Sequence, residues 1–184
     1  GGGDHGKGDG ALDSKDGATF CTFSYNHFHD TGKSNLCGMK SETVDNLICY
    51  HHNWFDHSDS RHPRVRTSSV HVWNNYYDGV AKYGIGVTMG ASVFVESNYF
   101  RNTKYPMMIS KQGTDAKGDG TFSGEAGGVL KSYDNIFAEK GSHFSYVTWK
   151  QSNTDFDAYE VESPSEKVPA TVVAKAGGTS YNNF

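Results

Sequence analysis

The stretch VWNNYY, from Val72 to Tyr77, places Asn75 two residues before the aromatic Tyr77. The same Asn-x-aromatic element stands in SYNHF (Ser24–Phe28), YHHNWF (Tyr50–Phe55), VESNYF (Val95–Phe100) and KSYDNIF (Lys131–Phe137), with a last copy at the C-terminus. The asparagines are residues 26, 53, 75, 98 and 135, so the steps are 27, 22, 23 and 37 residues. A step near 22 residues predicts one coil of a parallel β-helix for each copy.

Stacking explains why one asparagine and one aromatic would recur. Neighbouring coils lie at the inter-strand spacing of ~4.8 Å, so equivalent asparagines can hydrogen-bond in a ladder while the aromatic rings stack inside. Short β-rich runs precede the asparagines, and no comparably long run shows helical periodicity. We therefore expect an all-β fold, a single parallel β-helix domain over residues 1–184. A β-sandwich is the alternative, but its strands would not repeat this element at coil spacing.

Composition limits the class of protein further. The chain has 184 residues and a formal net charge of -4, with few basic clusters, which argues against a nucleic-acid binder. No stretch approaches the roughly 18 apolar residues of a membrane span. Since the chain begins without an initiator Met or a signal peptide and ends inside a copy of the repeat, we expect a fragment, truncated at both ends, of a longer catalytic domain. The segment Gly113–Gly128 is expected to be a long surface loop.

The repeat also fixes a register for the three cysteines, Cys21, Cys37 and Cys49. Aligning Asn26 with Asn53 sets Cys21 beside Ile48 and Thr22 beside Cys49. The thiols of Cys21 and Cys49 then lie on opposite faces of neighbouring strands. We therefore expect free cysteines.

Four cations fall at similar offsets from the ladder asparagines. Lys33 lies at +7, Arg61 at +8, Lys82 at +7 and Lys104 at +6, so on stacked coils they would form a cation stripe suited to a linear polyanion. The alternative is that they are ordinary solvated loop residues, and for Lys82 and Lys104 taken singly this alternative is favoured. The stretch SDSRHPRVR (Ser58–Arg66) adds two further arginines after the rigid Pro63. If Val65 points into the core, Arg64 and Arg66 share the opposite face, where guanidinium groups can bind carboxylates.

An acidic stretch lies near the N-terminus, GDGALDSKDG (Gly8–Gly17). Asp9 and Asp13 offer oxygen ligands on a glycine-bearing loop, which suits a hard cation such as Ca²⁺, while a solvated acidic loop is the alternative. Zinc is disfavoured because no three histidines converge at ligand spacing. A P-loop at Lys33 is rejected because His27 stands where that motif needs glycine.

From Asp9 to about Ser110, and less closely to its end, the chain resembles the pectate lyases of polysaccharide lyase family 1. The resemblance lies in DGALD (Asp9–Asp13), SYNHFHDTGKSNLCG (Ser24–Gly38), YHHNWFDHSDSRHPRVR (Tyr50–Arg66) and VHVWNNYYDG (Val70–Gly79). It implies a right-handed, single-stranded parallel β-helix. It also implies that Asp9 and Asp13 bind Ca²⁺, that Lys33 and Arg66 bind the substrate carboxylate, and that Arg61 is the catalytic base.

The resemblance implies Ca²⁺-assisted β-elimination of de-esterified polygalacturonate by a secreted or periplasmic enzyme, expected to be a monomer without nucleic-acid or membrane partners. A pectin lyase, which acts on methylated substrate without Ca²⁺, and a non-catalytic uronate-binding β-helix stay open as alternatives. A hydrolase would need paired carboxylates, and the acidic residues near Arg61 in sequence are Asp56 and Asp59.

Overall fold

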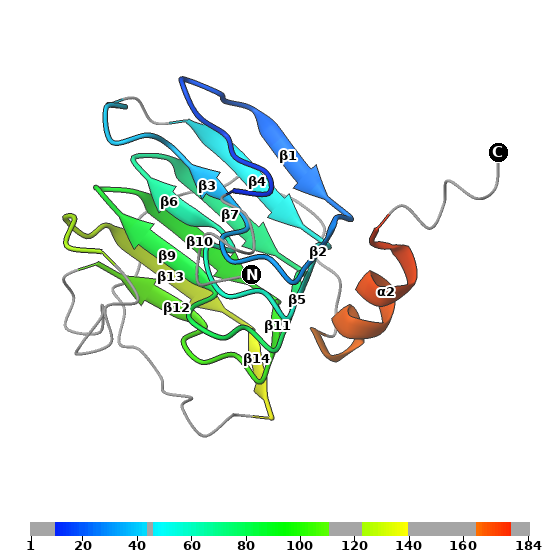
Figure 1. Cartoon of the computed structure of the whole chain (residues 1–184). Helices are drawn as coiled ribbons and strands as arrows, with labels where there is room; N and C mark the ends of the chain where they lie inside the picture. The colour runs from blue at the N-terminus through cyan, green and yellow to red at the C-terminus, as the bar shows by residue number, and fades with distance from the viewer. Residues whose placement is uncertain (1–9, 44–45, 111–122, 140–164, 178–184) are drawn as a thin grey trace, which may run out of the picture.

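Parallel strands wound into a solenoid form the body of the protein (Figure 1). The computed structural model describes residues 10–43, 46–110, 123–139 and 165–177. Successive strands visit three sheets in turn, and every pairing between named strands is parallel. The predicted all-β parallel β-helix is confirmed.

Each sheet is built from strands of consecutive coils. The first sheet contains β1 (Cys21–Ser24), β4 (Leu47–His51), β7 (Ser69–Trp73), β10 (Ser92–Glu96) and β13 (Val129–Tyr133). The second contains β2 (His27–His29), β5 (Trp54–Asp56), β8 (Tyr76–Asp78), β11 (Tyr99–Arg101) and β14 (Ile136–Ala138). The third contains β3 (Leu36–Cys37), β6 (Arg64–Arg66), β9 (Ile85–Thr88) and β12 (Met107–Ile109).

The asparagine ladder forms at the turn between the first and second sheets. The side-chain amide of each asparagine donates to Oδ1 of the next, from Asn26 through Asn53, Asn75 and Asn98 to Asn135, at 2.9, 3.0, 3.0 and 3.0 Å. Each of these Oδ1 atoms also accepts the backbone N–H of the preceding asparagine. The predicted ladder is confirmed over these five copies, and the copy at 181–184 lies outside the described residues.

The aromatic residues two positions after the asparagines stack inside the solenoid. Their ring centroids are 5.3, 4.8, 4.3 and 5.3 Å apart along the series Phe28, Phe55, Tyr77, Phe100 and Phe137. The three middle rings are almost fully buried. Stacked and tilted ring contacts of this kind stabilise the core beyond simple burial of area.

Left-handed backbone conformations bound each strand of the second sheet. The residue before each ladder asparagine has positive φ, as Tyr25, His52, Asn74, Ser97 and Asp134 show. The residue four positions after each asparagine does too, as Asp30, His57, Gly79, Asn102 and Glu139 show. Two such residues per coil turn the chain sharply at both ends of a three-residue strand. These bends repeat at equivalent places, so the coils stack in register.

The predicted cysteine register is also confirmed. In the first sheet Cys21 pairs with Ile48 and Thr22 with Cys49, and all three cysteines are free.

One short helix was not predicted from the sequence. It is α2 (Val168–Lys175), which follows the 3₁₀ turn η1 (Ser165–Lys167). Val168, Val172 and Ala176 are buried together with Tyr76 of the second sheet, against which α2 packs (Figure 1). The spacing of these apolar residues by four, and a proline at the start of the helix, were the available signals. Within the described ranges, no helix is long and apolar enough to cross a membrane.

Candidate functional site

The predicted cations gather on the third sheet and on the turns that lead into it. Lys33 and Ser60 form a parallel β-bridge. One residue further along, the carbonyl of Arg61 accepts the N–H of Asn35 at 2.7 Å. Lys33 and Arg61 therefore lie on adjacent coils, as predicted. The row continues, since the Lys82 backbone N–H donates to the Asp59 backbone carbonyl, on the coil before it, at 2.8 Å.

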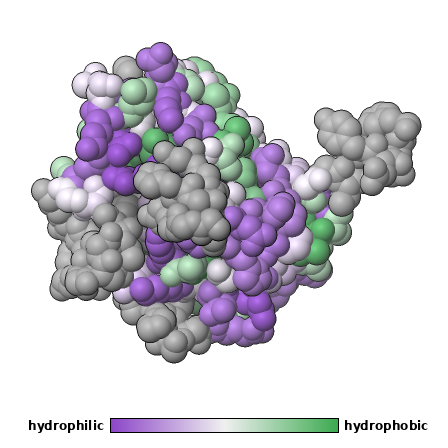
Figure 2. Space-filling view, in the orientation of Figure 1, coloured by the Kyte–Doolittle hydropathy of each residue, from purple (hydrophilic) through white to green (hydrophobic). Residues whose placement is uncertain are grey.

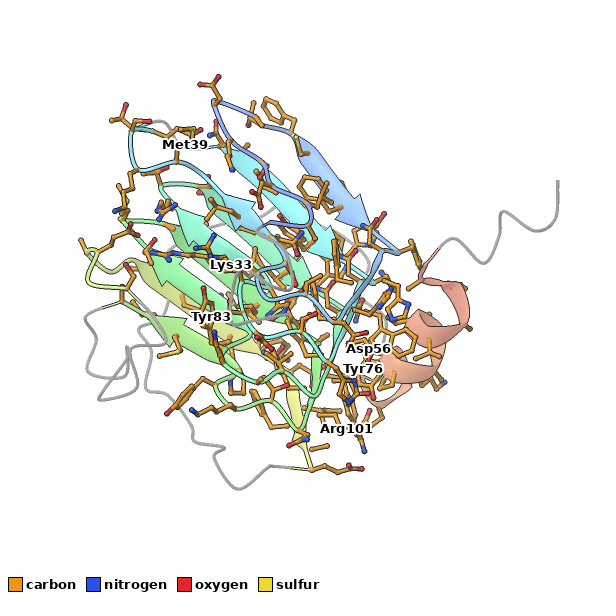
Figure 3. All side chains as sticks on the ribbon, in the orientation of Figure 1. Lys33, Met39, Asp56, Tyr76, Tyr83 and Arg101 are labelled. Atoms are coloured by element: carbon orange, nitrogen blue, oxygen red, sulfur yellow. The ribbon has the colours of Figure 1, made fainter. Side chains whose placement is uncertain are left out.

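Figures 2 and 3 show the surroundings of this row. Asp56 and Arg101 lie on the side of the molecule that carries α2, whereas Lys33 and Tyr83 lie away from α2 (Figure 3). In the same orientation, hydrophilic residues cover most of the described part of the visible face (Figure 2). Lys104, the last residue of the predicted stripe, places its ammonium 5.2 Å from the centre of the Tyr105 ring. The Lys104 N–H donates to the Val80 carbonyl at 3.1 Å, so the four predicted cations lie on consecutive coils.

Arg61 is followed by a buried and uncharged residue, His62. The backbone of Arg61 is left-handed, with φ of 64°, and its side chain is half-buried. The next residue, His62, is fully buried, and its Nδ1–H donates to the carbonyl of Tyr83 at 2.9 Å. Burial lowers the pKa of His62 to about 4, so the imidazole is neutral near pH 7. His62 therefore holds the turn in place and does not present a base to the surface.

Tyr83 is the aromatic neighbour of these arginines. Burial raises the pKa of its phenol to about 12, although Arg64 and Arg61 act in the opposite direction. The phenol therefore stays neutral, and its hydroxyl can donate a hydrogen bond.

Arg64 and Arg66 share one face of β6, as predicted, because the intervening Val65 is buried in the core. Both bind the carboxylate of Glu125. Arg66 donates from Nη2 to Oε1 at 2.9 Å and from Nε to Oε2 at 3.1 Å, and Arg64 donates from Nη2 to Oε2 at 3.0 Å. Arg66 also donates from Nη1 to the Gly38 carbonyl at 3.4 Å. The arginine pair, Arg64 and Arg66, is thus a built carboxylate site.

The electrostatics of this cluster are strong because little water reaches it. The side chains of Arg64, Arg66 and Glu125 are only 12%, 10% and 14% exposed. Burial alone would raise the pKa of Glu125, but the hydrogen bonds and charges of Arg66 and Arg64 outweigh it and lower that pKa to about 2. Lys40, 3.8 Å away, adds a third positive charge. Glu125 is therefore ionised at every ordinary pH.

Glu125 belongs to the segment that was expected to be a surface loop. Residues 113–122 lie outside the described part of the chain, but the end from 123 to 128 is anchored to the solenoid. Met89 and Gly90 donate their N–H groups to the carbonyls of Ala126 and Gly127 at 2.6 and 2.8 Å. A Cβ on Gly128 would lie 2.3 Å from the Ala91 carbonyl oxygen, so glycine permits this close approach. Glu125 was not predicted from the sequence. The available signal was the pair of arginines on one strand face, since two adjacent positive charges are stabilised by an anionic partner.

Asp13 is the described member of the predicted calcium pair, because Asp9 lies outside the described residues. Asp13 precedes a bridge between Ser14 and Cys37, which adds this segment to the edge of the third sheet beside β3. Its Oδ1 accepts the N–H of Leu36 at 2.9 Å, and its Oδ2 lies 2.9 Å from Lys15 Nζ. Asp13 thus lies on the same sheet as the arginine pair, on the coil next to that of Lys33.

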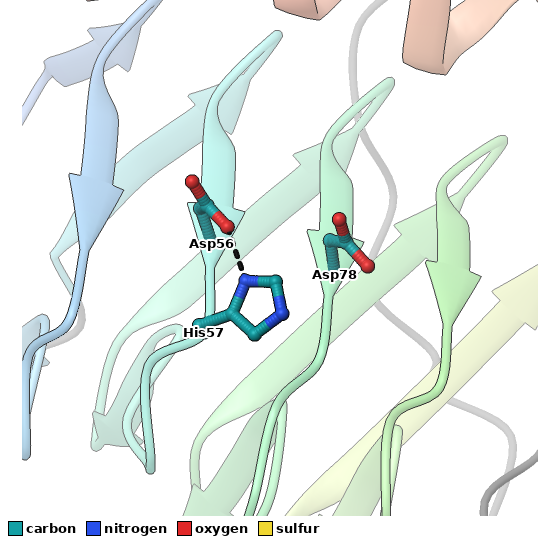
Figure 4. Close-up of side chains that lie close together, drawn as sticks. All are labelled: Asp56, His57 and Asp78. Carbon is teal, nitrogen blue, oxygen red and sulfur yellow. Dashed lines mark hydrogen bonds and ion pairs between the residues drawn. The ribbon is translucent and has the colours of Figure 1, made fainter.

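A second polar cluster stands on the second sheet. Asp56, His57 and Asp78 place one potential ligand atom each within 4.8 Å of one another (Figure 4). The sequence reasoning did not predict this group. His57 Nδ1 lies 2.5 Å from Asp56 Oδ1, and His27 Nε2 lies 2.9 Å from Asp56 Oδ2. Arg101 Nη1 lies 2.7 Å from Asp78 Oδ1. Hydrogen bonding to Asp56 raises the pKa of His57. These partners already balance the carboxylates, so the cluster is explained as a charge network between coils.

Comparisons with known proteins agree with this fold. A sequence model of a family described as pectate lyase matches residues 2–180. A pectate trisaccharide-lyase of Bacillus licheniformis is 41% identical over 101 residues, which are 54% of this chain and 30% of that protein. Pectate lyase 3 of Pectobacterium carotovorum is 31% identical over 150 residues, 78% of this chain and 39% of that protein.

Solved structures match over more of the chain. The crystal structure of a pectate lyase from a Bacillus species, in complex with trigalacturonate, superposes with a TM-score of 0.71 at 30% identity and covers 91% of this chain. Pectate lyase II from Xanthomonas campestris gives a TM-score of 0.70 at 30% identity and covers 92%. The chain spans 52% of each of those two solved chains and 30–39% of the two relatives above.

Proposed function

We propose, from the premise that this chain belongs to the pectate lyase family, that the protein carrying it cleaves de-esterified polygalacturonate by β-elimination. The observation that supports this most directly is the arginine pair beside Arg61, because it already binds a carboxylate in the fold. Lys33 on the adjacent coil extends the positive surface. A polymer of uronate units repeats its carboxylates along a line, as the coils repeat these cations.

The reaction removes the C5 proton, which lies α to a carboxylate, and expels the C4 glycosidic oxygen. In this proposal Lys33 and Arg66 bind the carboxylate of the unit that reacts, and so stabilise the negative charge that develops on it. Arg61 accepts the C5 proton. Guanidinium groups lose a proton only at high pH, so we expect an alkaline optimum.

Calcium is the proposed cofactor, with Asp9 and Asp13 as its ligands. The environment of Asp13 fits a hard cation: a carboxylate supplies the oxygen, and Gly10 leaves room beside it, since a Cβ there would lie 2.5 Å from Oδ2. Lys15, which now faces this oxygen, is 42% exposed and can turn away. When bound, the ion would supply positive charge next to the substrate carboxylate. We further propose that the protein is secreted and monomeric.

The test follows unsaturated product by its ultraviolet absorbance, with polygalacturonate as substrate. The wild-type protein should produce it, and a chelator should stop it. Arg61→Lys should reduce kcat by about a hundredfold or more while KM stays similar, because a proton acceptor is lost and the charge is kept. Arg101→Lys is the matched control, since Arg101 pairs with Asp78 on the second sheet. Full activity of Arg61→Lys would overturn the assignment of the base, and reducing ends without unsaturated product would identify a hydrolase.

A further inference from the structure

Glu125 places a negative charge inside a surface that is proposed to attract uronates. Its carboxylate is held by three donors of two arginines, at 2.9 to 3.1 Å. The segment that carries Glu125 is also held in place. The Glu125 N–H donates to Ser123 Oγ at 2.9 Å, and Ser110 Oγ donates to the Ser123 carbonyl at 2.8 Å. Glu125 is thus a built part of the site and not a passing surface contact.

The arginine pair without Glu125 would carry two positive charges, and with Glu125 it carries one. Arg66 is engaged through all three of its nitrogens, because Nε and Nη2 bind Glu125 and Nη1 binds the Gly38 carbonyl. A substrate carboxylate that reaches Arg66 must therefore share it with Glu125. Two carboxylates on one guanidinium repel each other, whereas a neutral methyl ester beside Glu125 meets no such repulsion.

We propose that Glu125 is a specificity-determining and positioning residue, which lowers the preference of the arginine pair for a charged uronate and lets this subsite accept a methyl-esterified one. This inference rests on the proposed function for the identity of the substrate. Glu125 acts through the arginines, because its carboxylate accepts hydrogen bonds from both guanidinium groups and offsets one of their charges.

The experiment measures binding, so that it does not depend on turnover. Trigalacturonate and its fully methyl-esterified form are titrated calorimetrically into proteins that all carry Arg61→Lys. The quantity compared is the ratio of the two dissociation constants. Adding Glu125→Gln should raise the preference for the charged ligand about fivefold, since one negative charge a few ångströms away is removed and the shape is kept. High salt should shrink this gain.

Two further variants make the result specific. Glu139→Gln removes the same charge from another arginine, Arg101, and should leave the ratio unchanged. Arg64→Gln removes a positive charge from the pair and should lower the preference for the charged ligand. This variant tests the role of the arginine pair even if Glu125→Gln folds poorly. An unchanged ratio in Glu125→Gln with a normal melting temperature overturns the inference, as does an equal change in Glu139→Gln.

The outcome separates this inference from the proposed function. If the ratio shifts as expected but the wild-type protein forms no unsaturated product, the β-elimination is wrong and the role of Glu125 stands. If product forms and the ratio does not shift, the role of Glu125 is wrong and the lyase stands. Binding of neither ligand, together with no unsaturated product from the wild-type protein, would overturn both.

Discussion

At the scale of single residues, the same residue type takes different roles because its neighbours differ. Arg66 is largely buried and binds a carboxylate of its own chain, while Arg101 lies on the outer side of the second sheet and pairs with Asp78. His62 is buried and neutral, whereas hydrogen bonding to Asp56 raises the pKa of the exposed His57. Burial and the nearest charge decide the chemistry of each side chain.

Glu125 gives a pH prediction at this scale. Its pKa is lowered from 4.5 to about 2 in the folded protein, so the unfolded chain binds the proton first as the pH falls. The stability that its ion pairs contribute is present above pH 4.5 and is lost progressively toward pH 2. Between these values the free energy of unfolding should therefore fall more steeply for wild type than for Glu125→Gln, as measured by urea titration. Parallel curves would contradict the assigned ion pairs.

At the scale of elements, the asparagine ladder ties one coil to the next. Asn75 is fully buried and in the middle of the ladder. Its Oδ1 accepts both the backbone and the side-chain N–H of Asn53, and its side-chain amide donates to Asn98 and to the Tyr50 carbonyl. Every one of these groups is out of reach of water, so each needs its partner.

Asn75→Ala should therefore destabilise the protein by about 3 kcal/mol or more, because it leaves several buried groups unsatisfied at about 1–3 kcal/mol each. Asn26→Ala is the matched control at the first rung, where the residue is only half-buried and donates one side-chain bond to Asn53. Its cost should be about 1 kcal/mol. Urea unfolding followed by circular dichroism measures both, and equal losses would show that the ladder is not cooperative.

At the scale of the whole molecule, the solenoid is covered on one side by a helix. The side chains of Val168 and Val172 are fully buried against the second sheet, near Tyr76. The helix packs on Tyr76, Trp54 and Tyr99, so it protects these aromatic residues of the second sheet from water.

Val172→Ala should lower the free energy of unfolding by about 1–2 kcal/mol, since it removes two buried methyl-sized groups. Val173→Ala is a control on the same helix, because Val173 is 43% exposed. It should change stability by less than about 0.5 kcal/mol. Equal effects of the two substitutions would mean that α2 does not dock through Val172.

A structural feature of this protein was predictable from the sequence when its residue pattern recurs on each coil. The ladder asparagines, the stacked aromatics and the cysteine register were all predictable, because coils that stack at one spacing repeat the same requirement at the same offset. The helix α2 has a single weak apolar face and no second copy, so no repeat in the sequence marks it.

The sequence by itself determined the coil, its period and the face on which Arg64 and Arg66 lie, because alternation and stacking are properties of short segments. Only the tertiary structure decided that Glu125, about sixty residues away, lies between those two arginines. The same holds for the cluster of Asp56, His57 and Asp78, which joins two coils. A charge pairs with whichever opposite charge the packed fold brings within a few ångströms, and that distance is set by how the coils and the returning loop stack, not by any local pattern.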